Sequence, residues 1–264
     1  MLSERVGLLS SKAILVYEMN EFIVDLHCHI VPYVDDGASV LEEALFLVES
    51  QYAQGVRTIC ATPHLRASMF ESSDEEIIRQ FGRLKEMAEE RFPDLTLFLS
   101  REYHCDRLLR EHLKKDMILP LGYRPGENRE KGALLIEFSG RHTWQQMEEY
   151  IELVQSFGFV PVIAHVERYP AAGSKEKVRA LAKLGARIQV NAGSILGRDG
   201  LKTRFLVRSL LKENLVDVVA SDCHDTEDRP CELQAAYYWI KEKYGASYAA
   251  AVLRDNPRKL LAVE

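Results

Sequence analysis

The sequence has few cysteines, no excess of basic residues and no long apolar run, and each of these absences argues against a class of protein. Its five cysteines are scattered and form no C-x-x-C pair, which argues against a zinc ribbon or a disulfide framework. Lysine and arginine number 34 against 40 aspartates and glutamates, a net charge of -6, so we expect no nucleic-acid partner. No stretch reaches the length of a transmembrane helix, and the N-terminus lacks the apolar core of a signal peptide. We therefore expect a cytoplasmic protein with no membrane insertion.

Short apolar runs alternate with amphipathic helical patterns along the chain, and no linker divides them. The runs that we interpret as strands are residues 22–24, 57–62, 95–99, 133–138, 159–164, 186–190 and 216–220. Ser39–Glu42 and Thr143–Gln146 have the S/T-x-x-E/Q pattern of a helix N-terminus. Strict alternation of strands and helices predicts an α/β fold with seven parallel strands in one domain, either a barrel or an open doubly wound sheet.

Two stretches fall outside this alternation. Residues 1–18 precede the first predicted strand, and we expect them to form an N-terminal extension outside the single domain, which spans residues 19–264. The polar segment Gly122–Lys131 predicts a long exposed loop.

Polar residues gather where the predicted strands end, which is where parallel α/β folds place their chemistry. Six of the seven strands end in a histidine, an aspartate or a glutamate, whereas the sixth ends in Q-V-N. In chain order these residues are His27, His29, His64, Glu102, Glu137, His165, Asp222 and His224. Asp25 shares a strand face with His27 and His29, so we expect it to orient the two histidines as a hydrogen-bond acceptor.

Taken singly, each of these residues fits a hydrogen-bonded core side chain or a helix cap. Together at one edge of the sheet, three carboxylates and five imidazoles would be strongly destabilising without a counter-charge. Divalent metal ions supply that charge. A mixture of imidazole and carboxylate ligands favours Mn, Fe or Zn over Mg or Ca alone, and so many ligands predict two or three ions. Such clusters typically generate hydroxide from water and hold a phosphoryl group during displacement.

Two arginines follow histidines of this set closely, Arg168 after His165 and Arg229 after His224. A guanidinium group binds a phosphate through two parallel hydrogen bonds, which suits a phosphate substrate beside the metal ions. Either arginine could equally form a surface salt bridge, and the residues alone favour neither interpretation.

The spacing C-x5-R, which some tyrosine phosphatases use, occurs twice, from Cys60 to Arg66 and from Cys223 to Arg229. That chemistry needs a thiolate inside a loop whose backbone N–H groups face the phosphate. The loop after Cys60 contains a proline and no glycine, and the loop after Cys223 would set three carboxylates against a dianion. We expect both matches to be chance.

The ordered motifs resemble the PHP superfamily, whose opening D-x-H-x-H and closing D-x-H are both present. More closely, the chain is similar to the metal-dependent protein-tyrosine phosphatases of bacterial capsule and exopolysaccharide biosynthesis. The resembling stretches are DLHCHIVPYVDDGASVLEEAL, QGVRTICATPH, LLIEFS, PVIAHVERY, QVNAGSILG, ASDCHDTEDRP and NPRKL. They follow the family's order and cover nearly everything after about residue 20.

The resemblance implies a distorted (βα)7 barrel with a manganese-dependent site, Fe or Zn being the alternatives. It implies that the metal ligands are His27, His29, Asp36, His64, Glu102, Glu137, His165, Asp222 and His224. Arg168 and Arg229 would bind the substrate phosphate, and Asp36 would join them as a catalytic residue. The implied reaction is hydrolysis of phosphotyrosine on an autophosphorylated bacterial tyrosine kinase that controls polysaccharide synthesis, by direct attack of metal-bound hydroxide.

Two other functions stay open from the sequence. A small-molecule phosphatase of the histidinol-phosphatase type would use the same strand ends. A non-catalytic metal-binding regulator would dock on a kinase without hydrolysing anything, although such a protein has no need of a complete ligand set.

Overall fold

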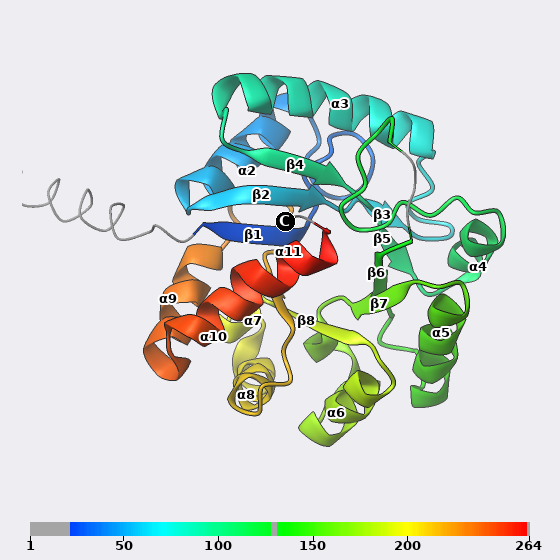
Figure 1. Cartoon of the computed structure of the whole chain (residues 1–264), viewed down its shortest axis with the longest axis vertical. Helices are drawn as coiled ribbons and strands as arrows, with labels where there is room; N and C mark the ends of the chain where they lie inside the picture. The colour runs from blue at the N-terminus through cyan, green and yellow to red at the C-terminus, as the bar shows by residue number, and fades with distance from the viewer. Residues whose placement is uncertain (1–21, 128–130, 263–264) are drawn as a thin grey trace, which may run out of the picture.

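A curled sheet of parallel strands organises the chain, and helices cover its outer face (Figure 1). The computed structural model describes residues 22–127 and 131–262, so the predicted extension at residues 1–18 lies outside the described residues. The strands are β1 (Ile23–Cys28), β2 (Val56–Ala61), β3 (His64–Leu65), β4 (Thr96–Leu99), β5 (Glu102–His104), β6 (Ala133–Glu137), β7 (Val160–Ile163), β8 (Arg187–Asn191) and β9 (Val218–Ala220).

Helices follow most of the strands. They are α2 (Leu41–Ala53), α3 (Asp74–Arg91), α4 (Arg107–Lys114), α5 (Trp144–Ser156), α6 (Lys175–Lys183), α7 (Ala192–Leu196), α8 (Gly200–Lys212), α9 (Leu233–Tyr244), α10 (Ala246–Ala250) and α11 (Asn256–Leu260). Short helical turns are η1 (Val166–Arg168), η2 (Pro170–Ala172) and η3 (Ala251–Asp255). Within residues 22–127 and 131–262, no helix is both long and apolar enough to span a bilayer. The described part of the predicted 122–131 loop contains neither helix nor strand.

All strand pairs are parallel, in the orders β1-β2-β4 and β3-β5-β6-β7-β8-β9. The first and last strands then meet at their carboxyl ends. The His29 N–H donates to the Cys223 carbonyl at 2.9 Å, and the Asp222 N–H donates to the His27 carbonyl at 2.8 Å. The prediction of an α/β fold with parallel strands is therefore confirmed, and the sheet curls until its two ends touch beside the candidate site.

The strand count differs from the seven predicted, because two of the predicted strands are each followed by a break and a second short strand. Pro63 lacks a backbone N–H and interrupts the ladder between β2 and β3. Between β4 and β5, the Arg101 side chain turns inward, where its guanidinium donates to Asp74 at 2.9 Å and to the His64 carbonyl at 3.0 Å. The described residues thus contain nine strand segments. The short strands β3 and β5 begin with His64 and Glu102, so the breaks bring these two residues to the candidate site.

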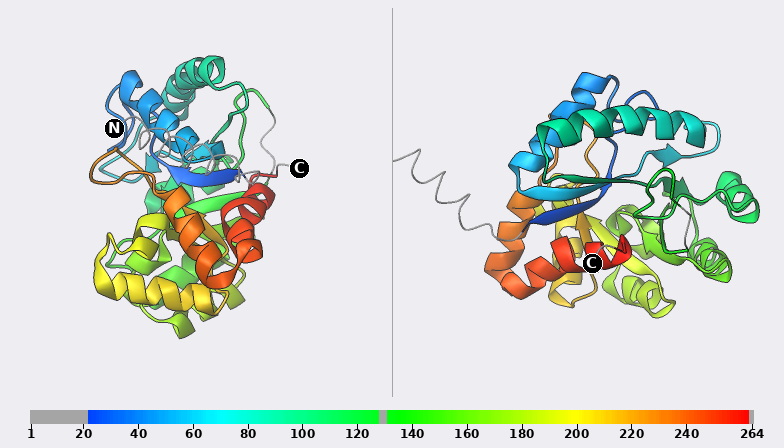
Figure 2. Two further views of the ribbon diagram at one scale, coloured as in Figure 1. Left: turned by 90° about the vertical axis from the view of Figure 1, so that its left-hand side faces the viewer. Right: turned by 45° about the horizontal axis from the view of Figure 1, so that its top comes forward.

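Two clusters of buried apolar side chains stabilise this arrangement. The larger lies between the sheet and the helices, and the smaller fills the inside of the curl. Val24 and Leu26 of β1, Phe98 of β4 and Val162 of β7 point into the smaller cluster, together with Leu261 just after α11. Figure 2 shows the C-terminal helices running beside β1, where η3 packs against both β1 and β9. The segment from η3 to Leu261 therefore closes the inside of the curl.

The two predicted helix caps have different outcomes. At the start of α5, Thr143 accepts the Gln146 N–H at 3.3 Å and the Gln146 side chain accepts the Thr143 N–H at 2.9 Å, which confirms the capping box. The predicted Ser39–Glu42 box is wrong. Ser39 donates instead to Glu43, one residue further on, because α2 begins later than the pattern predicts.

Candidate metal centre

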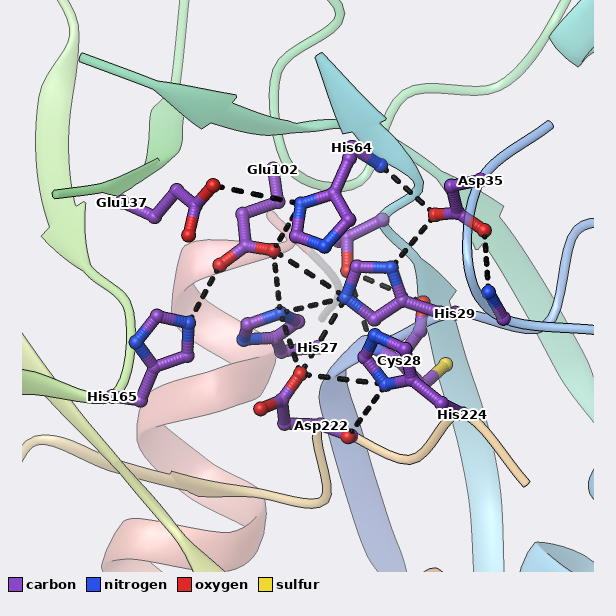
Figure 3. Close-up of polar contacts among 12 residues, drawn as sticks. His27, Cys28, His29, Asp35, His64, Glu102, Glu137, His165, Asp222 and His224 are labelled. Atoms are coloured by element: carbon purple, nitrogen blue, oxygen red, sulfur yellow. Dashed lines mark hydrogen bonds and ion pairs between the residues drawn. The ribbon is translucent and has the colours of Figure 1, made fainter. Parts of the chain in front are cut away.

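The structure brings all nine predicted ligands together at the carboxyl ends of the strands. Figure 3 shows how most of these side chains point toward one another from different strands. Their ligand atoms form four overlapping groups, each within 4.8 Å: His29, Asp36, His64 and His224; His27, Glu102 and His165; His27, His29 and Asp222; His64, Glu102 and Glu137. We call these nine residues the ligand cluster. Its overlapping groups offer more than one place for an ion.

Two histidines are held so that one ring nitrogen points into the cluster as an acceptor. The His29 Nδ1 lies 2.7 Å from the Asp35 carboxylate, and the His224 Nδ1 lies 3.0 Å from the Asp222 backbone carbonyl. Because both oxygens can only accept, each Nδ1 carries a hydrogen, and each Nε2 is the ring atom that can bind a metal ion. Oxygen partners of this kind fix metal-binding imidazoles in proteins.

Acceptor atoms face one another at the centre of the cluster. The His29 Nε2 lies 3.4 Å from Glu102 Oε2 and 3.5 Å from Asp222 Oδ1. Both oxygens, and the His224 Nε2, are buried and have no hydrogen-bond partner among the described residues. Buried polar atoms without partners are rare and destabilising, and a cation between them would satisfy all of them at once. The residues present therefore fit divalent metal ions.

The charges of the cluster support the same conclusion. Burial alone would raise the pKa of Glu102 and Asp222, but the neighbouring histidines outweigh burial and hold both pKa values well below their usual range. Burial and the adjacent His29 lower the pKa of His224 to about 4. Burial opposes a charge on His29, yet Asp35 and Asp222 raise its pKa well above the usual value. Metal ligands must be deprotonated. Of Glu102, Asp222, His224 and His29, only His29 has a raised pKa, so a metal ion competes with a proton there and not at the other three.

Backbone strain accompanies two of the ligands. His165 after β7 and Asp222 after β9 have φ values of 30° and 52°, in the left-handed region that non-glycine residues seldom adopt. Such conformations persist where the surrounding structure imposes them, and they concentrate at functional sites. In this chain they turn two side chains into the cluster directly after a strand ends.

The loop that carries Asp35 and Asp36 depends on Gly37. A Cβ atom at this position would lie 2.0 Å from the His29 carbonyl oxygen, so only glycine permits this approach. We expect Gly37→Ala to displace the loop, to weaken Mn²⁺ binding by about 10- to 100-fold through loss of the Asp35–His29 contact, and to lower the free energy of unfolding by about 1–3 kcal/mol.

Gly82→Ala is the matched control, because a Cβ on this α3 glycine meets nothing within 4 Å. It should raise the free energy of unfolding by up to about 1 kcal/mol and leave Mn²⁺ binding unchanged. Calorimetric titration and thermal unfolding measure both quantities. Unchanged metal binding in Gly37→Ala would show that the loop does not hold His29.

Asp25 does not orient the histidine rings, contrary to the sequence-based expectation. Its carboxylate accepts hydrogen bonds from the Ser221 N–H at 3.0 Å and from the Ser221 hydroxyl, and it meets His27 only at the backbone N–H. The pairing of β1 with β2 shifts register between Asp25 and Cys28, so regular alternation fails there. Asp25 ties the first strand to the last, and burial raises its pKa to about 6.

Asp35, Tyr169 and His104 contact the cluster and are among the residues that sequence reasoning missed. Asp35 holds His29 and also accepts the His64 backbone N–H at 3.0 Å. The Tyr169 hydroxyl lies 2.9 Å from His165 Nδ1, and His104 Nδ1 lies 3.1 Å from Glu137. His104 follows Glu102 by two positions on β5, so the alternation of that strand was the signal that could have identified it.

Neither C-x5-R cysteine is placed to act as a nucleophile. Cys60 is fully buried within β2, and burial raises the pKa of its thiol to about 12. Cys223 is also fully buried, and its sulfur accepts a hydrogen bond from the Gln51 amide at 3.4 Å. A reactive cysteine needs exposure and a lowered pKa, so this geometry favours the chance interpretation of both matches.

A curled parallel sheet with this cluster at its strand ends defines an α/β protein with a candidate multinuclear metal centre. Residues 23–262 match the family model for capsular polysaccharide synthesis, CpsB/CapC, and the chain belongs to this family. The resemblance noted in the sequence is thereby confirmed.

Individual relatives agree with this assignment. The tyrosine-protein phosphatase CpsB of Streptococcus pneumoniae is 38% identical over 245 residues, which cover 90% of this chain and 98% of CpsB. This chain also matches a structure from a study of YwqE from Bacillus subtilis and CpsB from Streptococcus pneumoniae, which are described there as unique metal-dependent tyrosine phosphatases. The TM-score is 0.81 and the identity 27%, and the match covers 91% of this chain and 94% of the other. A mutant of the organophosphorus hydrolase from Deinococcus radiodurans, at 13% identity and a TM-score of 0.58 over 90% and 92% of the two chains, shares the fold.

Proposed function

We propose that this protein is a metal-dependent phosphatase that hydrolyses phosphotyrosine on proteins, and that Mn²⁺ occupies its site as two or three ions. The observation that carries the proposal is the ligand cluster, in which buried acceptor atoms face one another beside two partly exposed arginines. Membership of the CpsB/CapC family and the names of its relatives support the tyrosine phosphatase activity. We also interpret the curled sheet as a distorted (βα)7 barrel, in which β2 with β3 and β4 with β5 each count as one interrupted strand.

The four groups of the ligand cluster would hold the ions, with Glu102 shared between two of them. When bound, ions of this kind activate water and stabilise the charge that develops on a transferring phosphoryl group. The imidazole content of the cluster favours Mn²⁺ over Mg²⁺. Asp36 is the most exposed predicted ligand, with 47% of its side chain accessible, whereas Glu102 and Asp222 are buried. Asp36 therefore marks the side from which a substrate reaches the cluster.

Arg168 and Arg229 would bind the phosphate on this open side. Arg168 Nη1 and Arg229 Nη2 lie 2.8 and 3.1 Å from the same oxygen of Asp222, and about a third of each side chain is accessible. Their anchoring on buried Asp222 leaves other guanidinium N–H groups for a phosphate oxygen. The tyrosine phenol has a pKa of about 10, so its phenolate leaves with less help from a proton donor than an aliphatic alkoxide. This favours an aryl phosphate over histidinol phosphate.

The substrate that we propose is an autophosphorylated bacterial tyrosine kinase that controls capsular or exopolysaccharide synthesis, because the family model concerns capsular polysaccharide synthesis. The deciding experiment compares hydrolysis of a phosphotyrosine peptide with that of histidinol phosphate by the Mn²⁺-loaded protein. Faster turnover of the peptide supports the proposal, and faster turnover of histidinol phosphate overturns it. Kinase binding without hydrolysis of either compound would favour a regulator.

We expect Arg168→Ala and Arg229→Ala each to raise KM for the peptide and Ki for inorganic phosphate by about 10- to 100-fold, because a hydrogen bond to a charged group contributes about 1.5–3 kcal/mol. Metal content should stay close to that of the wild type. Arg198→Ala is the matched control, because Arg198 lines the same 300 Å³ depression but is bound to Glu232 by two hydrogen bonds of 2.9 Å. Wild-type inhibition by phosphate in both variants would contradict the phosphate-binding role.

A further inference from the structure

Strand β8 supplies no residue of the ligand cluster. Two of its side chains nevertheless form hydrogen bonds at the ends of β1, β7 and β9, which supply His27, His165 and Asp222. Gln189 and Asn191 lie two positions apart, so they point to the same face of the strand. Both are buried, with 0% and 3% of their surface accessible. They correspond to the Q-V-N that ends the sixth predicted strand, the one end without a histidine or a carboxylate.

The two amides form one continuous chain of hydrogen bonds. Gln189 Oε1 lies 2.8 Å from the His165 backbone nitrogen and 3.1 Å from His27 Nδ1. Gln189 Nε2 donates to Asn191 Oδ1 at 2.8 Å, and Asn191 Nδ2 donates to Asp222 Oδ2 at 2.8 Å. The chain thus links the ends of β1, β7 and β9 through β8.

The groups at the two ends of this series of hydrogen bonds determine which atom donates in each of them. At one end, the His165 backbone N–H can only donate, so the Gln189 atom that faces it must be the oxygen. At the other end, the ionised Asp222 carboxylate can only accept, so the Asn191 atom that faces it must be the amide nitrogen. Both assignments agree on the bond between the two side chains, in which Gln189 donates to Asn191.

The fixed direction determines the tautomer of His27. Because Gln189 Oε1 is an acceptor, His27 must carry a hydrogen on Nδ1, and Nε2 is the ring atom that it offers to a metal ion. That Nε2 lies 3.3 Å from Glu102 Oε2 and 3.4 Å from Asp222 Oδ1, inside the ligand cluster. Asn191 binds Asp222 through Oδ2. The other carboxylate oxygen of Asp222, Oδ1, therefore faces His27 and His29 in the ligand cluster.

We propose that Gln189 and Asn191 are positioning residues that prepare His27 and Asp222 for metal, the first by fixing the imidazole tautomer and the second by aiming the carboxylate. This role rests on the ligand roles proposed above for His27 and Asp222. A neutral amide chain suits the task, because a carboxylate at either position would add a third negative charge beside Glu102 and Asp222. The backbone of β8 is held in place as well, because the Asn191 N–H donates to the buried Glu167 carboxylate at 2.8 Å.

Gln189→Met tests the tautomer, because methionine has a similar length but no acceptor for His27. In the metal-free variant, ¹⁵N NMR of the imidazoles should show His27 losing its single Nδ1–H form. The dissociation constant for Mn²⁺ should rise about 10- to 100-fold, as for other outer partners of metal-bound histidines. At saturating Mn²⁺, KM for the peptide should be unchanged.

Gln51→Met is the matched control, because Gln51 is equally buried and its amide contacts a cysteine sulfur instead of a ligand. It should leave the His27 spectrum and Mn²⁺ binding unchanged. Asn191→Leu should weaken Mn²⁺ binding without altering the His27 tautomer. In the double variant Gln189→Met/Asn191→Leu, the losses of binding free energy should fall short of their sum if the two amides act as one chain.

Wild-type Mn²⁺ affinity together with an unchanged His27 tautomer in Gln189→Met would overturn the proposal. If Gln189→Met does not fold, Gln189→Glu replaces it, because a carboxylate keeps the acceptor for His27 but turns a second oxygen against Asn191. Gln189→Glu should retain the Nδ1–H form and bind Mn²⁺ more weakly, and wild-type binding in that variant would again overturn the proposal. Both readouts are taken without substrate, so a failure of the phosphatase assay does not affect them.

Discussion

Removal of metal is expected to abolish hydrolysis of a phosphotyrosine peptide, and Mn²⁺ is expected to restore it more fully than Mg²⁺. Glu102 Oε2, Asp222 Oδ1 and His224 Nε2 have no hydrogen-bond partner among the described residues, so without ions the two carboxylates repel an anionic phosphate. Loss of several kcal/mol of transition-state stabilisation corresponds to a fall of about 10³-fold or more in kcat. The preference for Mn²⁺ follows from the imidazoles, which suit it better than Mg²⁺.

The measurement pairs kcat with metal content by mass spectrometry after exhaustive chelation and after addition of each metal. Thermal unfolding gives a second readout, because a metal that binds only the folded chain raises Tm. Full activity in protein shown to contain no metal would contradict both the cofactor and the proposed chemistry.

Glu102→Gln is expected to reduce kcat by at least about 10²-fold, the upper end of the effect of removing an outer partner of a metal. The reason lies in how both carboxylate oxygens are used. Oε1 lies 2.8 Å from His165 Nε2, and Oε2 lies 2.9 Å from His64 Nδ1. Glutamine has nearly the same shape but presents an NH₂ group in place of one oxygen, so it can serve one side of the cluster and not the other.

Glu167→Gln is the control for this substitution, because Glu167 is a buried carboxyl close by whose oxygen accepts the Asn191 backbone N–H. It contacts no side chain of the ligand cluster in the hydrogen bonds of the described residues, and the glutamine oxygen can accept the same N–H. Its kcat should stay near that of the wild type, with circular dichroism confirming the fold of both variants. A Glu102→Gln protein with full metal content and near-normal kcat would remove Glu102 from the ligand set.

The strand ends were readable from the sequence because two regularities coincide there. Apolar runs mark the strands, and parallel strands place their carboxyl ends at one edge, so His165 and Asp222 could be grouped although 57 positions in the sequence numbering separate them (222 − 165). The interruption at Arg101 could not be read in this way, because it depends on a contact with Asp74 on a distant helix. Regular alternation also misplaced Asp25, since a local register shift is set by pairing with β2.

The amides of β8 were missed for a different reason. Glutamine and asparagine are not metal ligands of choice, so their residue types carried no signal for a metal centre. Their importance depends on which atoms they face, and only the arrangement of β1, β7 and β9 around β8 decides that. Similarly, Asp35 lay within the opening motif, but its contact with His29 depends on the close approach of Gly37.

The meeting of the first and last strands at the cluster has a consequence for the time at which the protein becomes active during its synthesis. His27 and His29 leave the ribosome early, whereas Asp222 and His224 emerge only after almost the whole chain has been translated. A nascent chain that stops before β9 carries the first two histidines and Glu102 but lacks Asp222, the second carboxylate that faces them. On the ligand roles proposed above, incomplete translation products therefore lack part of the ligand cluster, and only a chain translated through His224 contains all nine of its residues.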